Sequence, residues 1–476
     1  SVSKQFTAMG IVLLHLQGKL SIDDDIRKYL PELPEFEVPV TIRHMMHHTS
    51  GLRSLHALLE LAGWRSDDTR TNKDLYRFMQ RQRHLNFTPG AEYLYCNTGY
   101  MFMADIIERI TGEPFAVWMQ TSIFEPLGML NTYVEDVYNR VVPNNATSYY
   151  NTKNGFERAV EYWGYVGSGN MHATTNDLMR WLSNFYDPKP GWEAPFELLQ
   201  TLDKLNSGAE NTYAFGVGIN NFNGFKRIQH SGAIGGFRSF ACTYPDQRLN
   251  IVVLTNFSSS SPVQKANKIS EILLGKAEVK TILNAGRSPV KTVKRSNRQL
   301  RQYVGSYWND TDNYARKIYL KKDTLRYFRS ENNESALAPV GNHTFQMLGV
   351  DGDVQVRFTS GKNGAKTMLV TIDGGPPILA DAFTPVSPSN KGLQAYTGEF
   401  YSPELETTYA ISVKDKKLFY HHARHGDAEM KFLKKDVLEG KWPFNIVKFK
   451  SDASGRVEGI LVSNGRVRNL WFEKRN

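Results

Sequence analysis

The chain has 476 residues, a net charge of +10 and 41% hydrophobic residues, which is enough for two or three domains with separate cores. No run of about 18 apolar residues occurs, so the sequence indicates no membrane-spanning helix. The basic residues are scattered, which favours a solvated surface over a nucleic-acid site and leaves an affinity for acidic polymers open. Cys96 and Cys242 show no metal-ligand spacing, so a zinc site is not expected.

The first four residues read Ser-x-x-Lys, and a helix is predicted over residues 3–17. Residues three apart share a helix face, so the Ser1 hydroxyl and the Lys4 amine can meet there. A serine needs an adjacent base to act as a nucleophile, and a desolvated lysine can be that base. The helix N-terminus also favours developing negative charge. Alone, this pattern favours a solvated helix surface, and the motifs that follow raise the case for a catalytic pair.

Three histidines follow in residues 41–52. Thr41 is placed to cap a short helix, and Gly51 to end the loop after it. His44 and His48 are four residues apart, a spacing that zinc could use, and His47 lies between them. Because no HExxH glutamate accompanies them, histidines that support a loop are the favoured interpretation.

A second motif, Tyr95-Cys96-Asn97, is predicted on a loop just before a helix that closes near Gly112. A tyrosine there can act as phenol or phenolate, and an asparagine offers both a donor and an acceptor. By itself the motif would favour a turn residue beside a core aromatic residue.

A third motif lies in a region of short strands, which are predicted over residues 213–219, 225–230, 237–244 and 249–256. Between the second and third strands stands His230-Ser231-Gly232-Ala233. Small residues at a strand edge let a substrate backbone approach closely. The alternative is a glycine-rich hairpin turn.

The last third of the chain is predicted to contain short alternating strands, and it repeats itself with an offset of 93 residues. The first members of the repeated pairs are Leu300, Tyr303, Gly305, Leu325 and Tyr327, and the second members are Leu393, Tyr396, Gly398, Leu418 and Tyr420. We therefore expect two copies of a small antiparallel barrel, over 299–386 and 390–476, after a basic linker over 276–298.

Taken in order, the three motifs resemble those of the serine β-lactamase-like, penicillin-recognising hydrolases, above all the class C β-lactamase and D-aminopeptidase branch. The resemblance covers residues 1–275. It implies an α+β fold with an antiparallel sheet flanked by helices, and the two trailing β-domains resemble lipocalin-like barrels. Further matching phrases are Gly18-Lys19-Leu20-Ser21, Tyr29-Leu30-Pro31, His47-His48-Thr49-Ser50-Gly51-Leu52, Pro89-Gly90 and Pro126-Leu127-Gly128-Met129.

The resemblance implies a role for each residue of the first two motifs. Ser1 would be the acylated nucleophile, and Lys4 would take up or relay its proton. Tyr95 would be the partner base or acid, and Asn97 would hydrogen-bond Lys4 and the substrate amide. No metal or organic cofactor is implied.

The third motif departs from the family pattern. His230 stands where β-lactamases usually carry the lysine of Lys-Thr-Gly, while the backbone N–H groups of Ser1 and of Ala233, next to Gly232, would bind the oxyanion. A histidine is not a permanent cation near pH 7. The resemblance therefore points to D-amino-acid peptidases, amidases or esterases rather than to β-lactamases proper.

A second departure is that the chain begins at Ser1, because the family has strands upstream. Three origins are open: a cleaved precursor whose upstream segment stays bound, a shortened record of the chain, and an N-terminal nucleophile whose α-amine serves as base. The first two are favoured equally over the third.

The sequence thus predicts a serine hydrolase that forms an acyl-enzyme on Ser1 and cleaves amides in short or D-amino-acid-containing peptides. Esterase or β-lactamase-like activity is the alternative, and a silent peptide- or peptidoglycan-binding protein is another. An aminopeptidase would need an anion for the substrate ammonium group, and an acidic residue from a barrel loop would favour it. A homo-oligomer stays open, and the resemblance implies a periplasmic or secreted location.

Overall fold

The computed structural model describes residues 1–275, 292–330, 333–350, 354–360, 366–372, 377–386 and 390–475. The chain divides into two compact units, Ser1–Lys280 and Thr281–Asn476. Residues 276–291 of the predicted linker lie outside the described residues. The domain limits proposed from the sequence stay predictions.

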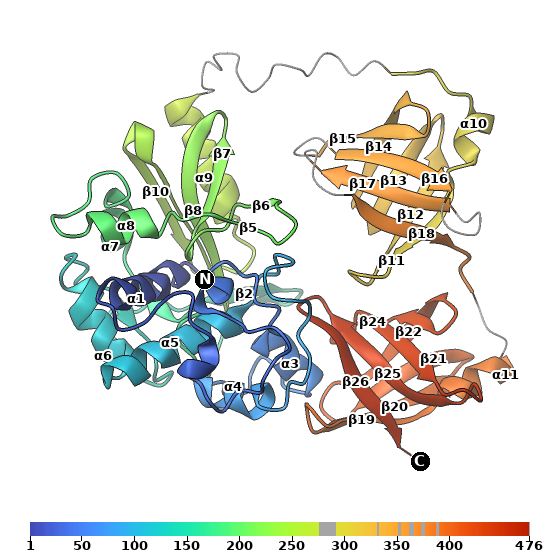
Figure 1. Ribbon diagram of the computed structural model, residues 1–476, viewed down its shortest axis with the longest axis horizontal. Coiled ribbons are helices and arrows are strands. Elements are labelled where there is room, and N and C mark those ends of the chain that lie inside the picture. Colours follow the sequence, from blue (N-terminus) through green and yellow to red (C-terminus); the bar gives the residue numbers. More distant parts are fainter. Residues whose placement is uncertain are drawn as a thin grey trace. The chain divides into compact units, whose positions relative to one another are not determined.

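The first unit contains most of the helices (Figure 1). Its α-helices are α1 (Lys4–Leu16), α2 (Ile42–Met46), α3 (Leu55–Leu61), α4 (Asn72–Met79), α5 (Asn97–Thr111), α6 (Phe115–Met119), α7 (Thr175–Ser183), α8 (Glu193–Leu198) and α9 (Pro262–Leu274). Short 3-10 or π segments cover Ile26–Lys28, Gln120–Phe124 and Pro245–Gln247.

The main sheet of this unit has the antiparallel order β10-β9-β8-β7. Its strands are β7 (Gly218–Phe222), β8 (Phe225–Ile234), β9 (Phe237–Tyr244) and β10 (Leu249–Thr255). The prediction of a strand over 213–219 was therefore largely wrong, because β7 begins only at Gly218. Strand β8 also continues through the third motif, so the hairpin turn comes later, at Gly235 and Gly236. Three two-stranded ladders pair β1 (Tyr133–Val134) with β4 (Met171–His172), β2 (Tyr149–Thr152) with β3 (Gly155–Arg158), and β5 (Asp203–Lys204) with β6 (Glu210–Asn211).

Strand alternation gives this sheet two faces, each covered by a helix. On one face, Phe240, Cys242 and Tyr244 of β9 pack with Ala266 of α9. Neighbouring side chains of a strand point to opposite faces, and Asn250 of β10 donates from the other face to Ser183 of α7 at 3.0 Å. The sheet therefore lies between helices, as predicted.

Helix α1 is the central helix of the first unit. The helix predicted over 3–17 is confirmed with the bounds Lys4–Leu16. Most of its apolar side chains, among them Phe6 and Met9, are buried, whereas Leu16 at its end is exposed. Gly216, just before β7, lets its segment pass close to the start of α1, because a Cβ at this position would lie 2.7 Å from the Cα of Gln5. Burial on nearly all sides holds the start of α1 in one place.

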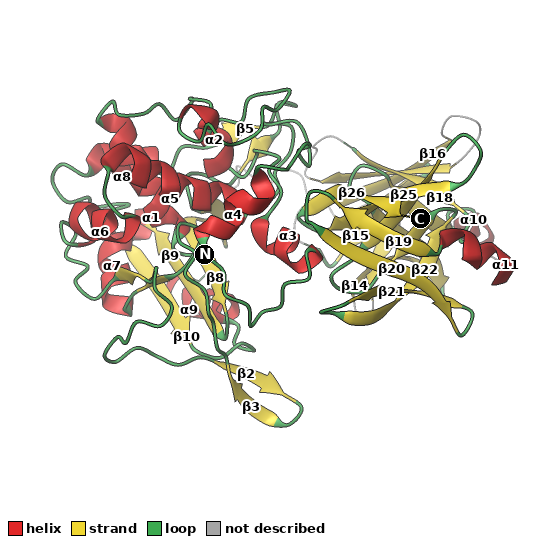
Figure 2. Cartoon of the chain, turned by 90° about the horizontal axis from the view of Figure 1, so that it is seen from below, coloured by secondary structure: helices red, strands yellow, loops and turns green. Residues whose placement is uncertain are grey.

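The second unit contains two closed antiparallel barrels of eight strands each, so the predicted fold class is confirmed. Figure 2 shows that this unit is built almost entirely of strands. The first barrel comprises β11 (Gly305–Asn309), β12 (Tyr314–Lys321), β13 (Thr324–Ser330), β14 (Asn333–Gly341), β15 (Thr344–Leu348), β16 (Val354–Ser360), β17 (Lys366–Ile372) and β18 (Ile378–Phe383), and helix α10 (Asn297–Arg301) precedes it. The second comprises β19 (Gly398–Ser402), β20 (Thr407–Lys414), β21 (Lys417–His422), β22 (Gly426–Lys434), β23 (Val437–Glu439), β24 (Ile446–Ser451), β25 (Val457–Asn464) and β26 (Val467–Arg475), and helices α11 (Asn390–Leu393) and Gln394–Tyr396 precede it.

The 93-residue repeat places equivalent side chains in both barrel cores. Leu325 and Tyr327 of β13 are buried, as are Leu418 and Tyr420 of β21. Consecutive strands pair in both barrels and the first strand closes on the last. A likeness to lipocalins stays a prediction. None of the helices in the described ranges has the length and apolar character that a membrane crossing requires.

Candidate active site

Ser1 and Lys4 are brought together as the sequence predicted. Lys4 is fully buried, and its Nζ lies 3.2 Å from the Ser1 Oγ. The Lys4 N–H donates to the Ser1 carbonyl at 3.1 Å, so residues 1–4 form the turn that leads into α1. A buried amine within hydrogen-bond distance of a hydroxyl is the arrangement that activates a serine.

The second partner of Lys4 comes from a distant loop. Lys4 Nζ donates to the carbonyl oxygen of Ser168 at 2.6 Å. The preceding carbonyl, of Gly167, accepts from Thr7 Oγ1 at 2.7 Å and so ties the same loop to α1. Gly167 has a φ of +89°, and a Cβ there would lie 2.2 Å from the Tyr100 carbonyl oxygen. Only glycine fits this turn.

The loop that carries Tyr95 is held by His48. The His48 carbonyl accepts from Leu94 N–H at 2.9 Å, and His48 Nδ1 accepts from Cys96 N–H at 3.1 Å. The His48 and Tyr95 ring centroids are 4.1 Å apart. His48 has a φ of +58°, which histidine adopts more readily than most residues. The Tyr95 ring in turn lies 4.8 Å from Lys4 Nζ.

Asn97 begins helix α5 and lines a cavity beside Ser1. Its Oδ1 is buried and has no hydrogen-bond partner among the residues that the structure describes. The hydrogen bond from Lys4 to Asn97 that the resemblance implies is therefore not formed here. The acceptor instead remains available to a ligand in the cavity.

His230 lies in the middle of β8, buried, with both ring nitrogens bonded. Its Nδ1 is 2.6 Å from the Ser231 carbonyl oxygen, which can only accept, so Nδ1 carries the proton. Its Nε2 therefore accepts from the Tyr213 hydroxyl at 2.9 Å. Burial, and after it the charge of Lys4, lower the pKa of His230 to about 3. The ring is neutral near pH 7 and supplies no cation.

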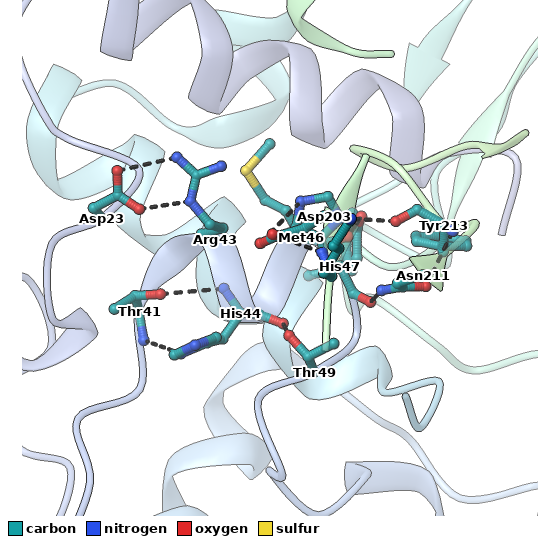
Figure 3. A network of polar contacts seen from close by, with 12 residues as sticks. Asp23, Thr41, Arg43, His44, Met46, His47, Thr49, Asp203, Asn211 and Tyr213 are labelled. Atoms are coloured by element: carbon teal, nitrogen blue, oxygen red, sulfur yellow. Dashed lines mark hydrogen bonds and ion pairs between the residues drawn. The ribbon is translucent and has the colours of Figure 1, made fainter. Parts of the chain in front are cut away.

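A polar network behind the site positions Tyr213 (Figure 3). His47 Nδ1 donates to the Tyr213 carbonyl oxygen at 2.7 Å, and Asn211 donates to the His47 carbonyl at 3.1 Å. His44 points elsewhere, because it forms a capping box with Thr41 at the start of α2. The histidines therefore support loops, and no group of three His, Cys, Asp or Glu in the described ranges is close enough to hold a metal ion.

Gly232 and Ala233 lie on β8 against the first residue of the chain. A Cβ on Gly232 would come 2.3 Å from Ser239 Oγ and 3.2 Å from the Ser1 nitrogen, so only glycine permits this approach. Ala233 is exposed and lines both cavities beside Ser1. The third motif thus meets the first at the nucleophile.

Two cavities open beside Ser1. The smaller has about 330 Å³ and includes Asn97, Arg70 and Trp163 in its wall. The larger has about 1250 Å³ and includes Glu135 and Glu161. An extended substrate can therefore pass Ser1 with one part in each cavity.

Sequence reasoning did not identify Ser168, Tyr213, Arg70 or Arg238 as part of this site, and it gave His48 only a general loop-supporting role. None of these residues stands in a motif with a chemical signature. The lysine partner at Ser168 is a backbone carbonyl, which any residue would supply.

Comparison with known proteins identifies the first unit. The Beta-lactamase family model matches residues 1–275. Penicillin-binding protein 4* of Bacillus subtilis (strain 168) is 28% identical over 396 residues, which cover 79% of this chain and 85% of that protein. A D-aminopeptidase of Gluconobacter oxydans (strain 621H) is 28% identical over 274 residues, 57% of this chain, and the match spans about half of its own length, 51%.

A solved structure shows the same fold. The octameric penicillin-binding protein homologue from Pyrococcus abyssi is 24% identical, with a TM-score of 0.51 over 80% of this chain and 86% of that one. At this identity the likeness concerns the fold alone.

Proposed function

We propose that this chain works through an acyl-enzyme on Ser1. It belongs to the beta-lactamase family and is thus a serine hydrolase that acts on amides. The observation that carries the proposal is the distance of 3.2 Å between the buried Lys4 Nζ and the Ser1 Oγ. The substrate class we propose is short or D-amino-acid-containing peptides, which the match to D-aminopeptidases supports.

In the first half-reaction, Lys4 in its amine form accepts the Ser1 hydroxyl proton while Oγ attacks the substrate carbonyl carbon. The backbone N–H groups of Ser1 and Ala233 stabilise the oxyanion, a contribution of about 3 kcal/mol for one such donor in other enzymes. The C–N bond then breaks, and the leaving nitrogen takes up a proton relayed through Lys4 and Tyr95. This leaves an ester on Ser1 and a free amine.

In the second half-reaction, water attacks the ester carbonyl and gives up a proton to the same pair. The C–O bond to Ser1 breaks, Oγ recovers its proton and the acid product leaves. His230 holds Tyr213 in place and stays neutral throughout, since its pKa is about 3. Asn97 offers its Oδ1 to the substrate amide N–H.

An aminopeptidase needs an anion for the substrate ammonium group. Of the acidic residues in the wall of the larger cavity, Glu135 pairs with His172 at 2.6 Å. Glu161 accepts from Ser148 and from the Gly236 N–H, and burial raises its pKa. Because burial opposes its charged form, Glu161 can serve as that anion only when the substrate ammonium group pairs with it.

The test is labelling with an uncharged fluorophosphonate, followed by intact mass and peptide mapping. We expect one adduct, on Ser1, and no turnover of D-aminoacyl amides by the Ser1→Ala protein. Hydrolysis by Ser1→Ala at the wild-type rate would contradict the proposal. Absence of an adduct would favour the silent peptide-binding alternative, and faster cleavage of matched esters than of amides would favour an esterase.

Oligomeric state, location and the origin of the start at Ser1 stay predictions. The intact mass would also show whether a second polypeptide accompanies the chain.

A further inference from the structure

The smaller cavity beside Ser1 has a wall of one charge sign. The guanidinium groups of Arg70 and Arg238 line it, and among the residues that the structure describes no carboxylate does. A cation taken out of water is costly unless it is paired. The composition of this wall therefore suits an anionic ligand.

Arg70 is buried, with 6% of its surface exposed, and its side chain donates to a backbone oxygen. Its Nη2 donates to the Arg65 carbonyl at 3.0 Å, while its Nε has no partner within the described residues. Its own N–H donates to the Tyr162 carbonyl at 3.1 Å, and its carbonyl accepts from Gly164 at 2.8 Å. The guanidinium is thus fixed before any ligand arrives.

Trp163 completes this part of the wall. Its ring lies 5.2 Å from the Arg70 Cζ, so the guanidinium packs against the indole face. The Trp163 Nε1 is buried and, among the described residues, finds no acceptor. Two residues of this wall therefore have a buried donor without an acceptor among the described residues, Arg70 at Nε and Trp163 at Nε1.

Arg238, the other arginine of this wall, also donates from its side chain to backbone oxygens. Its Nη1 donates to the carbonyls of Gly235 and Phe237 at 2.8 and 2.7 Å. The side-chain hydrogen bonds of Arg70 and Arg238 within the described residues go to backbone oxygens and not to carboxylates. Burial lowers the pKa of Arg70 and is the larger influence on it, while the charges of Glu60 and Asp68 also act on this residue. The two arginines thus keep their charge available to the cavity.

We propose that the smaller cavity binds a carboxylate of the substrate, with Arg70 as the main cation and Trp163 as its support. This inference rests on the proposed function and sharpens it, because it selects acidic amides. The carboxylate belongs either to an acidic side chain of the acyl part or to the C-terminus of the leaving part. Both sources present the same chemistry to a guanidinium.

Two matched substrate pairs test the inference and separate the two sources. The first pair is the D-Glu and D-Gln p-nitroanilides, which differ in the acyl part. The second pair is N-acetyl-D-alanyl-D-alanine and its C-terminal amide, which differ in the leaving part. We expect kcat/KM to be higher for the carboxylate member by about tenfold to a hundredfold in one pair. The pair that shows this preference identifies whether the bound carboxylate belongs to the acyl part or to the leaving part. Equal values in both pairs overturn the inference.

Arg70→Gln identifies the residue responsible, and Arg65→Gln is the matched control. Arg65 is exposed, bonds Asp67, and holds Arg70 only through its backbone carbonyl. We expect the preference to fall toward one in Arg70→Gln and to persist in Arg65→Gln. If Arg70 only supported the fold, both members of a pair would slow equally and the preference would persist, which would overturn the proposal.

Binding to the Ser1→Ala protein separates this proposal from the proposed function. Calorimetry with the unreacted members of each pair measures the cavity without any chemistry. Tighter binding of the carboxylate member by about tenfold or more supports the inference even where the fluorophosphonate fails to label Ser1. Equal affinities overturn it even where labelling succeeds.

Discussion

Buried polar groups around Ser1 differ from those inside the barrels. Around Ser1, the Asn97 Oδ1, Ser168 Oγ and Arg70 Nε are all buried and have no partner among the described residues. In the barrels, the Tyr307 hydroxyl donates to the Tyr303 carbonyl at 2.8 Å, and the Tyr420 hydroxyl donates to the Trp442 carbonyl at 2.7 Å. Asn313 Oδ1 and Arg316 Nε are the barrel atoms that are buried without a partner among the described residues.

Unpartnered buried polar atoms thus occur in both regions, but those of Asn97, Ser168 and Arg70 belong to residues that line one cavity beside Ser1. A buried polar atom without a partner lowers stability, so its persistence calls for a reason such as binding. Natural proteins break the rules of polar satisfaction chiefly at functional sites. Substitutions near Ser1 should therefore change activity more than stability, and substitutions in the barrels should do the reverse.

The largest effect is expected for Lys4→Met. Methionine fills a similar volume, so unfolding should change little, whereas loss of the base should lower amide hydrolysis about 10²–10⁴-fold. Substrate turnover and thermal unfolding of the full chain measure the two effects. A variant that hydrolyses amides normally would remove Lys4 from the mechanism.

Tyr420→Ala should give the opposite pattern. The side chain is fully buried and packs 4.4 Å from the Phe444 ring, so its removal should destabilise the second barrel by about 3–5 kcal/mol. Hydrogen exchange of β20 and β21 would locate the loss. Labelling of Ser1 by the fluorophosphonate should proceed at the wild-type rate, and slower labelling would contradict the comparison.

His230 makes stability depend on pH. Its folded pKa is about 3 against about 6.5 in an unfolded chain, so between these values the unfolded state binds more protons. The stabilisation is present above pH 6.5 and is lost as the pH falls toward 3, by roughly 3 kcal/mol at pH 4. The stability of wild type relative to His230→Gln should therefore shrink on acidification. Exposed His84, changed to Gln, is the control and should leave the pH dependence unaltered.

His48→Ala should slow the reaction, although in our proposal the His48 side chain positions the Tyr95 loop and does not contact the substrate. Loss of the bond to Cys96 N–H releases the Tyr95 loop, and misplacement by about 1 Å can cost up to 10²-fold. Asparagine adopts positive φ and keeps an acceptor, so His48→Asn should recover part of the labelling rate. Equal loss in both variants would indicate a general structural role.

The smallest effect concerns a tyrosine hydrogen bond that occurs at equivalent positions within each barrel. The Tyr396 hydroxyl donates to the Asp436 carboxylate at 2.7 Å, and Tyr303, 93 residues earlier, bonds His343 at 2.9 Å. Tyr396→Phe should destabilise the chain by about 1.5 kcal/mol and Tyr303→Phe by about 1, because bonds to charged groups contribute more. Urea unfolding measures both, and equal losses would show that the partner's charge is immaterial.

The sequence alone determined the features that depend on neighbours along the chain. Helical periodicity placed α1, and its N-terminus set Ser1 and Lys4 on one face. The 93-residue repeat gave two barrels, since equal spacing of core residues builds equal strands. The order of three motifs indicated the hydrolase fold, because each motif carries chemistry at a fixed short spacing.

Only the tertiary structure decided what surrounds the nucleophile. Ser168, which binds Lys4 through its carbonyl, lies 164 residues away in sequence, and Arg70 and Trp163 reach the same cavity from separate loops. The sequence also could not show that His230 is buried and neutral. Such features arise from contacts between distant segments, and their backbone groups and ordinary side chains acquire a role only when packing removes water and fixes their neighbours.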